Sequence, residues 1–308
     1  MTRTARATAI ANSYSADARL ARRLLTPALA LLVLVIGFPL VWTFWESLHL
    51  HDLRMPWIGR PFAWLANYQE GLADVRFRDA IGHTALFTAV SVGLELVAGL
   101  ALALAMHRAL RARALVRVLV LLPWAVPTAV SALVWRFLFD SQAGLVNHIL
   151  ASLHLTVSSG VWLADPVAAW VPIIAADVWK TTPFVALLLL AGLQGIDESI
   201  YDAARIDGAG PWRQFVEVTL PLLEPAIVVA VAFRILDAFR VFDLIFVLTG
   251  GGPGTATESV SMYIFSALLQ KLRFGYASAL SVVVFTATFV LGLVYVRVAG
   301  RSLTRVDG

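Results

Sequence analysis

The chain contains 308 residues, of which 59% are hydrophobic and 14% are charged, and its mean hydropathy is +0.80. Soluble domains carry about a quarter charged residues, so this composition excludes an ordinary soluble protein and indicates an integral membrane protein. The absence of cysteine excludes disulfide bonds, thiolate metal sites and cysteine nucleophiles.

Long apolar segments recur along the chain, and each is long enough to cross ~30 Å of hydrocarbon as a helix. They lack the alternating pattern of an outer-membrane barrel, and backbone groups in lipid must be satisfied within each segment. The sequence therefore predicts an all-α membrane protein with six transmembrane helices, at about Leu25–Trp45, Ala80–Met106, Val116–Phe139, Ala168–Gly192, Leu222–Leu248 and Tyr276–Val298.

Arginines are concentrated on one side of this arrangement. They lie in the first 23 residues, in the C-terminal tail and, between the second and third segments, at Arg108, Arg111, Arg113 and Arg117. Because Lys and Arg collect on the cytoplasmic side of membrane proteins, we expect both termini to be cytoplasmic. The net charge of +4 is thus a topology signal and no argument for a nucleic-acid partner.

Hydropathy divides the chain into three parts. Residues 1–23 are expected to form a cytoplasmic segment, residues 24–300 a six-helix transmembrane domain, and residues 301–308 a cytoplasmic tail. The first apolar segment is too long and too late for a cleaved signal peptide, so it is interpreted as an anchor. A cytoplasmic loop at about 195–221 joins the fourth and fifth segments.

This loop has the pattern of a short helix, a break and a second short helix. Ser199 and Asp202 have the spacing of a capping box, which predicts the start of the first helix. Gly208 and Gly210 are expected to take positive φ and end it. Pro211 suits the first turn of the second helix.

Pro221 is expected to begin the fifth transmembrane helix, for the same reason. Ala203, Ala204 and Gly208 give the loop a small-residue surface that another protein can approach closely. On spacing alone, an ordinary connecting loop explains these features equally well.

The loop nevertheless contains a specific series of residues: Asp202-Ala203-Ala204, Asp207-Gly208-Ala209, Phe215 and Leu220-Pro221. This series resembles the EAA loop of the permeases of binding-protein-dependent ABC importers, in which the loop forms a coupling helix seated in a groove of the cytoplasmic ATPase. Asp202 stands where the family usually has Glu, which keeps the charge on a shorter side chain. The resemblance implies that the ATPase-coupling residues are Asp202, Ala203, Ala204, Asp207, Gly208 and Ala209.

The resemblance extends over nearly the whole chain, from about Leu25 to Val298. It is closest to the first permease subunit of maltose- and trehalose-type carbohydrate importers, and it implies the type I importer permease fold. The matching residues outside the loop are Asn67-Tyr68, Leu122–Pro127, Trp135–Phe139, Gly144, Asn147, Phe242-Asp243, Leu248–Pro253, Thr257 and Gly275–Ala279.

Several ionisable residues fall inside the predicted spans, where charges are costly and usually face a bundle interior or a wet cavity. Glu95 stands alone in the second segment, where hydrogen bonding between helices is the favoured interpretation. Three-residue spacing separates Asp177 from Lys180, and it also separates successive members of Arg234, Asp237, Arg240 and Asp243.

Two interpretations of these charges stay open. Neighbours three apart on a helix can meet, so the charges can form a ladder that satisfies itself. Alternatively, some of them line a translocation path, since carboxylates and guanidinium groups complement sugar hydroxyls. By resemblance to the maltose-type permease, the expected substrate-path residues are Asp177, Lys180, Arg234 and Asp237.

The resemblance implies a subunit of an ATP-driven sugar importer in the bacterial cytoplasmic membrane. Its expected partners are a second, homologous permease, two ATPase subunits, an external binding protein, a carbohydrate substrate and membrane lipid. The chain has no Gly-x-x-x-x-Gly-Lys-Ser/Thr sequence, so ATP and Mg²⁺ are expected on the ATPase subunits. We expect no cofactor, metal or catalytic site in this chain.

Two other classes of function were weighed. A secondary transporter driven by an ion gradient explains the intramembrane charges, but it predicts an internal repeat that is absent from the sequence. A membrane-embedded enzyme requires a nucleophile with a base, or a metal cluster, and no suitable spacing is present. The sequence leaves the cargo open among maltose, trehalose, an oligosaccharide, a polyol and a glycerol phosphate.

Overall fold

The computed structural model describes residues 23–108, 113–154 and 161–303. Within these ranges the protein is helical and has no β-strand, although isolated bridges join His49 to Phe62 and Asp52 to Arg273. Five of the described helices are long and apolar enough to cross a membrane, and a bent pair provides a sixth if it counts as one span.

The five long helices overlap the predicted first, second, fourth, fifth and sixth segments. The first contains the wide turn η1 (Val33–Gly37) and α2 (Phe38–Ser47), and the others include α4 (Val75–Arg108), α8 (Trp170–Gln194), α11 (Leu220–Ala238) and α14 (Phe274–Leu303). As candidate spans they run over Arg23–Ser47, Val75–His107, Trp170–Gln194, Pro211–Ala238 and Phe274–Arg297.

The predicted third segment is not a straight helix. It is divided into α5 (Arg113–Ala125) and α6 (Thr128–Leu138), which meet at an angle of 90°. Pro127 has no N–H to donate and disfavours helical backbone at the residue before it, so the helix breaks at Val126.

The predicted fifth segment is also wrong in its length. The helix ends at Ala238, and Asp243 begins a separate short helix, α12 (Asp243–Leu248). Arg240 and Asp243 therefore do not continue the helical ladder that the spacing indicated, and of that ladder only Arg234 and Asp237 share one helix.

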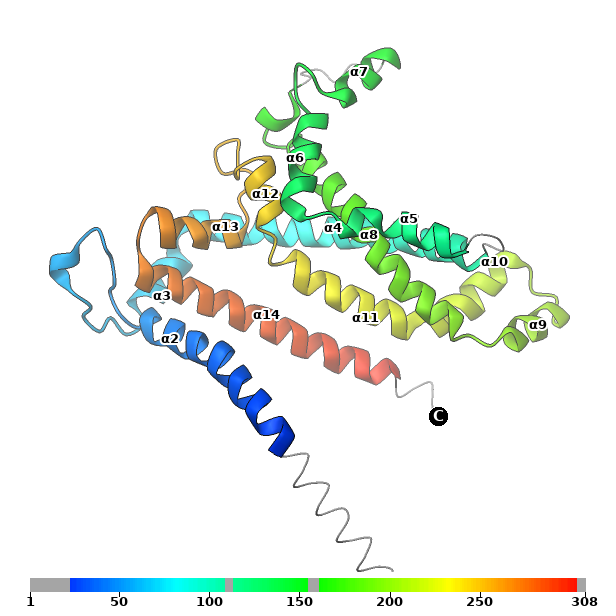
Figure 1. Ribbon diagram of the computed structural model, residues 1–308, viewed down its shortest axis with the longest axis horizontal. Coiled ribbons are helices and arrows are strands. Elements are labelled where there is room, and N and C mark those ends of the chain that lie inside the picture. The colour runs from blue at the N-terminus through cyan, green and yellow to red at the C-terminus, as the bar shows by residue number, and fades with distance from the viewer. Residues whose placement is uncertain (1–22, 109–112, 155–160, 304–308) are drawn as a thin grey trace, which may run out of the picture.

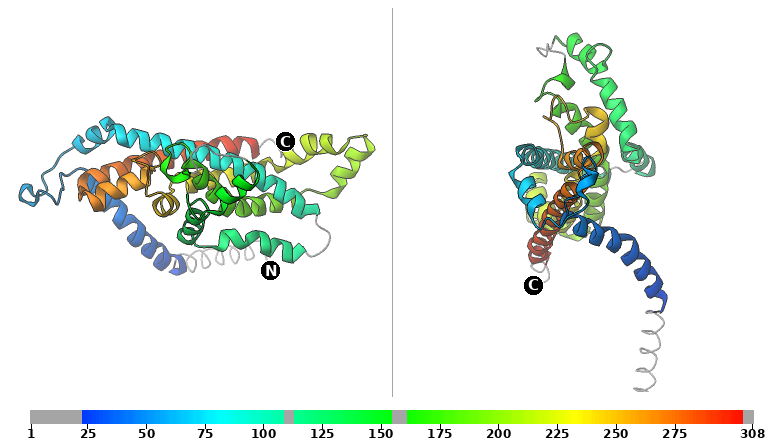
Figure 2. Two further views of the ribbon diagram at one scale, coloured as in Figure 1. Left: turned by 90° about the horizontal axis from the view of Figure 1, so that it is seen from above. Right: turned by 90° about the vertical axis from the view of Figure 1, so that its left-hand side faces the viewer.

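The long helices form an elongated bundle (Figure 1). One end carries α3 and the loop after α2, and the opposite end carries α9 and α10, while α6 and α7 project from the side (Figures 1 and 2). The remaining elements are η2 (Pro56–Ile58), α3 (Ala66–Ala73), α7 (Leu145–Ser152), η3 (Trp162–Ala164), α9 (Glu198–Ile206), α10 (Pro211–Gln214), η4 (Phe215–Thr219), α13 (Val260–Phe265) and η5 (Ser266–Gln270).

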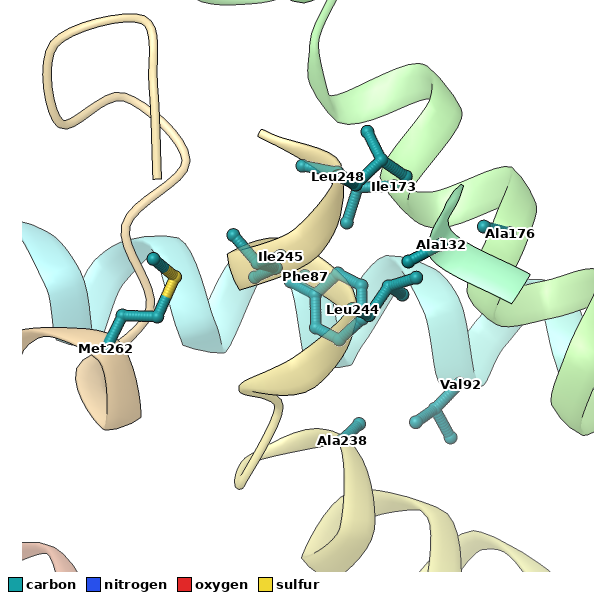
Figure 3. Packing of buried hydrophobic residues seen from close by; sticks show 10 residues of the cluster. All are labelled: Phe87, Val92, Ala132, Ile173, Ala176, Ala238, Leu244, Ile245, Leu248 and Met262. Carbon is teal, nitrogen blue, oxygen red and sulfur yellow. The ribbon is translucent and has the colours of Figure 1, made fainter. Parts of the chain in front are cut away.

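A buried hydrophobic cluster lies where α4 and α8 meet the short helices α6 and α12. Phe87 of α4, Ala132 of α6, Ile173 of α8 and Leu244 of α12 are all buried in one cluster (Figure 3). This packing fixes the rotation of α8 and α4, and thereby decides which of their polar residues face inward.

Candidate functional site

A buried ionic cluster joins three of the long helices. Arg234 of α11 is 2% exposed, Glu95 of α4 is 0% exposed and Asp177 of α8 is 9% exposed. The Arg234 guanidinium donates to both carboxylate oxygens of Glu95, from Nε to Oε2 and, at 2.7 Å, from Nη2 to Oε1. Its Nη2 also lies 2.9 Å from Asp177 Oδ2.

A hydroxyl completes this arrangement. Thr181 Oγ1 lies 2.6 Å from Glu95 Oε1 and 2.6 Å from the carbonyl oxygen of Asp177. The interhelical hydrogen bonding expected for Glu95 is therefore present, and its partner is a guanidinium that the sequence did not identify. A buried charge that loses its partner costs about 3–5 kcal/mol, so the cluster ties α4, α8 and α11 together.

Asp237 lies at the exposed edge of the same cluster. Its Oδ2 accepts from Arg234 Nη1 at 2.5 Å, yet its side chain is 74% exposed. Lys180 turns away from Asp177 on α8, and its Nζ donates to the carbonyl of Trp124 at 3.4 Å. The structure thus brings Asp177, Arg234 and Asp237 together and leaves Lys180 separate from them.

Three aromatic residues pack together next to Lys180 and Asp237. The carbonyl of Trp124 accepts from Lys180, and Phe233 lies one helical turn before Asp237. The rings of Trp124 and Phe184 stack with centroids 5.8 Å apart, and Phe184 meets Phe233 edge to face at 6.1 Å. Phe184 and Phe233 each lie four residues from one of the charges, and this spacing could have revealed them. These five residues are called the aromatic face below.

The loop between α8 and α11 contains the helix α9. Asp197 caps this helix, and its Oδ1 accepts from the backbone N–H of Ser199 at 2.8 Å. That bond lowers the pKa of Asp197 below its ordinary value. The predicted capping box of Ser199 and Asp202 is therefore wrong, because Asp197 supplies the acceptor; Asp202 pairs with Arg205 at 3.1 Å instead.

Gly208 ends α9 as predicted, with φ of +78°. The N–H of Ala209 reaches back to the carbonyl of Ala204 at 2.9 Å, which closes the helix end. Gly210 was expected to take positive φ and does not: its φ is −69° and it precedes α10 in an extended conformation. One left-handed residue is enough to reverse the chain here.

Pro211 occupies the first turn of α10, as predicted. Pro221 lies in the first turn of α11, as predicted, although the helical backbone before it is continuous from Pro211. The turn before it, η4, is a wide π turn. Since Pro221 lacks an N–H and its ring crowds the carbonyl of Glu217, the wider turn accommodates it within the helix.

The expected coupling residues all lie on this loop, which exposes apolar side chains. Ile206 at the end of α9 is 87% exposed and Trp212 of α10 is 76% exposed. Asp202, Ala203 and Asp207 are exposed on the same loop. Apolar side chains this exposed beside charged ones are typical of a protein interaction surface.

Comparison with known proteins matches residues 95–304 to the family described as binding-protein-dependent transport system inner membrane component. The trehalose/maltose transport system permease protein MalF of Thermococcus litoralis is 43% identical, over 92% of this chain and 94% of that protein. The trehalose transport system permease protein SugA of Mycobacterium tuberculosis is 39% identical, over 94% and 92%. The sulfoquinovosyl glycerol transport system permease protein SmoG of Agrobacterium fabrum is 40% identical, over 92% and 91%.

Solved structures share the fold. A chain of a bacterial ABC transporter involved in the import of the acidic polysaccharide alginate superposes with a TM-score of 0.80 at 22% identity, covering 95% of this chain and 98% of the other. A second structure of a bacterial alginate ABC transporter, in complex with an alginate pentasaccharide-bound periplasmic protein, gives a TM-score of 0.76 at 22% identity, over 96% and 97%.

Proposed function

The chain belongs to the family of binding-protein-dependent transport system inner membrane components, and on that premise we propose that it forms half of the translocation pathway of an ATP-driven sugar importer. Like its relatives, it is a multi-pass permease subunit of an ABC transporter in the inner membrane and has no catalytic role. The ATPase of such a transporter is a separate subunit.

The observation that carries the sugar proposal is the aromatic face. Sugars present hydroxyls that donate and accept hydrogen bonds, and apolar C–H faces that pack against aromatic rings. Phe184 and Phe233 supply such rings on two neighbouring spans, and Asp237 and Lys180 supply a carboxylate and an ammonium beside them. The outer residues of the aromatic face, Trp124, Phe233 and Asp237, are exposed in the isolated subunit, so a second, homologous permease has room to close the pathway over it.

Within this proposal the buried charges have distinct roles. Asp177 and Arg234 hold α8 and α11 together, and Arg234 also pairs with Asp237 at the exposed edge of the cluster. Only Asp237 and Lys180, of the four expected substrate-path residues, present exposed polar groups for a neutral disaccharide such as trehalose or maltose.

Replacing Asp237 with Asn tests the pathway. Sugar uptake should fall about tenfold or more, because a charged hydrogen-bond acceptor is lost, while the yield of assembled complex stays unchanged. Uptake of labelled trehalose and maltose into proteoliposomes measures the effect. Glu224→Gln is the matched control, an exposed carboxylate on the same helix. Normal uptake by D237N, or equal loss of uptake in both variants, would remove Asp237 from the pathway.

The loop from Asp197 to Thr219 is the proposed contact with the ATPase subunits. Its exposed Ile206 and Trp212, together with Asp202 and Gly208 on the same loop, offer the apolar and small-residue surface that a groove in another protein can accept. Two ATPase subunits would close on ATP and Mg²⁺ and move this loop, which continues without a break into α11. An external binding protein would deliver the sugar at the opposite end of the bundle.

We also propose that α9 faces the cytoplasm and α3 the outside. The native chain has no cysteine, so single cysteines report their own exposure. Gln69→Cys on α3 and Ser199→Cys on α9 replace exposed polar residues at opposite ends of the bundle. In intact cells, a membrane-impermeant maleimide should label Q69C at once and S199C only after the membrane is opened. Labelling of both from the same side would overturn this orientation.

A further inference from the structure

A cavity of about 580 Å³ lies at the end of the bundle that carries α9 and α10. Its apolar part is formed where α4 and α8 end, by Leu104, Met106 and Leu193. The polar part is formed by the same ends of α4 and α8 together with α5, α9 and the start of the fifth span. Its polar lining consists of His107, Arg117, Gln194, Glu198, Tyr201, Arg205, Gln214 and Thr219.

The lining includes Arg117 of α5, whose side chain has a buried hydrogen-bond donor without an acceptor in the described part of the chain. Its Nε is buried, yet it has no hydrogen-bond partner among the described residues. No ion pair of Arg117 is present in the same ranges either. A buried donor without an acceptor costs about 1–3 kcal/mol, and more for a charged group. None of the described residues supplies an acceptor to Arg117 Nε, so a bound anion would satisfy it.

Several other polar side chains of the lining already have hydrogen-bond or ion-pair partners within the protein. Tyr201 Oη lies 3.1 Å from Thr219 Oγ1, and Gln214 donates to the carbonyl of Ala209 at 2.7 Å. Arg205 is paired with Asp202 at the surface. Glu198 contributes one carboxylate to the lining but forms no ion pair with Arg117 in the described ranges.

We propose that this cavity binds the phosphate group of an anionic ligand through Arg117. A guanidinium presents paired N–H donors that match phosphate oxygens, and the apolar floor suits a ligand with a hydrocarbon part. An anionic phospholipid of the cytoplasmic leaflet combines both features. The sequence places Arg108, Arg111 and Arg113 just before Arg117, and basic segments at this position concentrate anionic lipid.

The proposal rests on the proposed orientation in which α9 faces the cytoplasm. It places the lipid between α5 and α9. A ligand in this cavity contacts α5 and the first turns of α9 together. It would therefore brace the coupling loop against the bundle, so that the lipid composition of the membrane adjusts how the loop meets the ATPase.

The test measures binding directly and does not depend on sugar transport. The full chain, purified in mild detergent with the subunits that accompany it, is titrated with dioleoyl phosphatidylglycerol and, separately, with dioleoyl phosphatidylcholine, and bound lipid is counted by native mass spectrometry. Phosphatidylglycerol should bind more tightly to the wild type, and Arg117→Gln should weaken it about tenfold or more. Arg213→Gln, an exposed arginine paired with Glu217 at the same end, should leave it unchanged.

Two further measurements keep the result interpretable. Arg117→Lys keeps the charge and serves if R117Q fails to elute as a folded complex; it should weaken binding by a smaller factor. A thermal-shift titration with sodium phosphate tells whether the bound phosphate belongs to a lipid or to a soluble ligand. If phosphate stabilises the wild type but not R117Q, and no lipid binds, the site is supported with a soluble ligand. Equal binding of phosphatidylglycerol by wild type, R117Q and R117K, with no response to phosphate, would overturn the proposal while leaving the importer assignment untouched.

Discussion

Arg234→Ala is expected to prevent the accumulation of folded, assembled protein. The substitution leaves Glu95 and Asp177 as buried carboxylates without a guanidinium partner, at 0% and 9% exposure. Breaking a buried ion pair by removing one partner costs about 3–5 kcal/mol, which is a large part of the stability of an ordinary protein. Fluorescence-detected size-exclusion chromatography of a tagged chain should show loss of the monodisperse peak.

Compensating variants separate charge from packing in this experiment. A triple variant, R234A with Glu95→Gln and Asp177→Asn, removes the unpaired charges and should recover part of the folded material, although the cavity remains. Asp237→Asn on its own should not affect assembly, because that carboxylate is exposed. A monodisperse, thermally stable R234A protein would contradict the structural role of the cluster.

Gly208→Val is expected to uncouple ATP hydrolysis from sugar uptake without preventing membrane insertion. The backbone of Gly208 has φ of +78°, where a residue with a side chain is disfavoured by about 1–2 kcal/mol. This corresponds to a population shift of about tenfold away from the loop conformation that we propose docks on the ATPase. Uptake into proteoliposomes should fall about tenfold while ATP hydrolysis by the same preparation continues.

The loop itself provides the matched control. A Cβ on either Gly208 or Gly210 meets no atom within 4 Å, but the φ of Gly210 is an ordinary −69°. Gly210→Val should therefore be tolerated far better than Gly208→Val. Gly208→Asn, which accepts the left-handed conformation more readily, should restore part of the coupling. Coupled transport by G208V at the wild-type level would contradict the proposed docking of this loop.

Much of the fold follows from composition alone. A membrane helix needs about 20 apolar residues, so the sequence predicts a span correctly wherever such a segment is uninterrupted, as in α4, α8 and α14. The break in the third segment also had a local signal in Pro127. The end of α11 at Ala238 had none, because Phe239–Phe242 contains neither Gly nor Pro; the packing of α12 against α6 and α8 decides it.

The site was predictable to a smaller extent. Spacing identified Arg234 and Asp237 as a pair, because both lie on one helix. It could not identify Glu95 as the principal partner of Arg234, since 139 residues separate them and their meeting depends on the rotation of two helices. For the same reason the spacing of Asp177 and Lys180 indicated a pair, whereas one turns into the bundle and the other away from it.

The most direct test of the importer assignment is purification of the tagged chain in mild detergent, followed by identification of its partners and assay of ATP hydrolysis. We expect a second permease and an ATPase to copurify, and a sugar-loaded binding protein to stimulate hydrolysis severalfold after reconstitution. A chain that purifies alone and moves sugar in response to an ion gradient, without ATP, would contradict the account and make the intramembrane charges the coupling machinery.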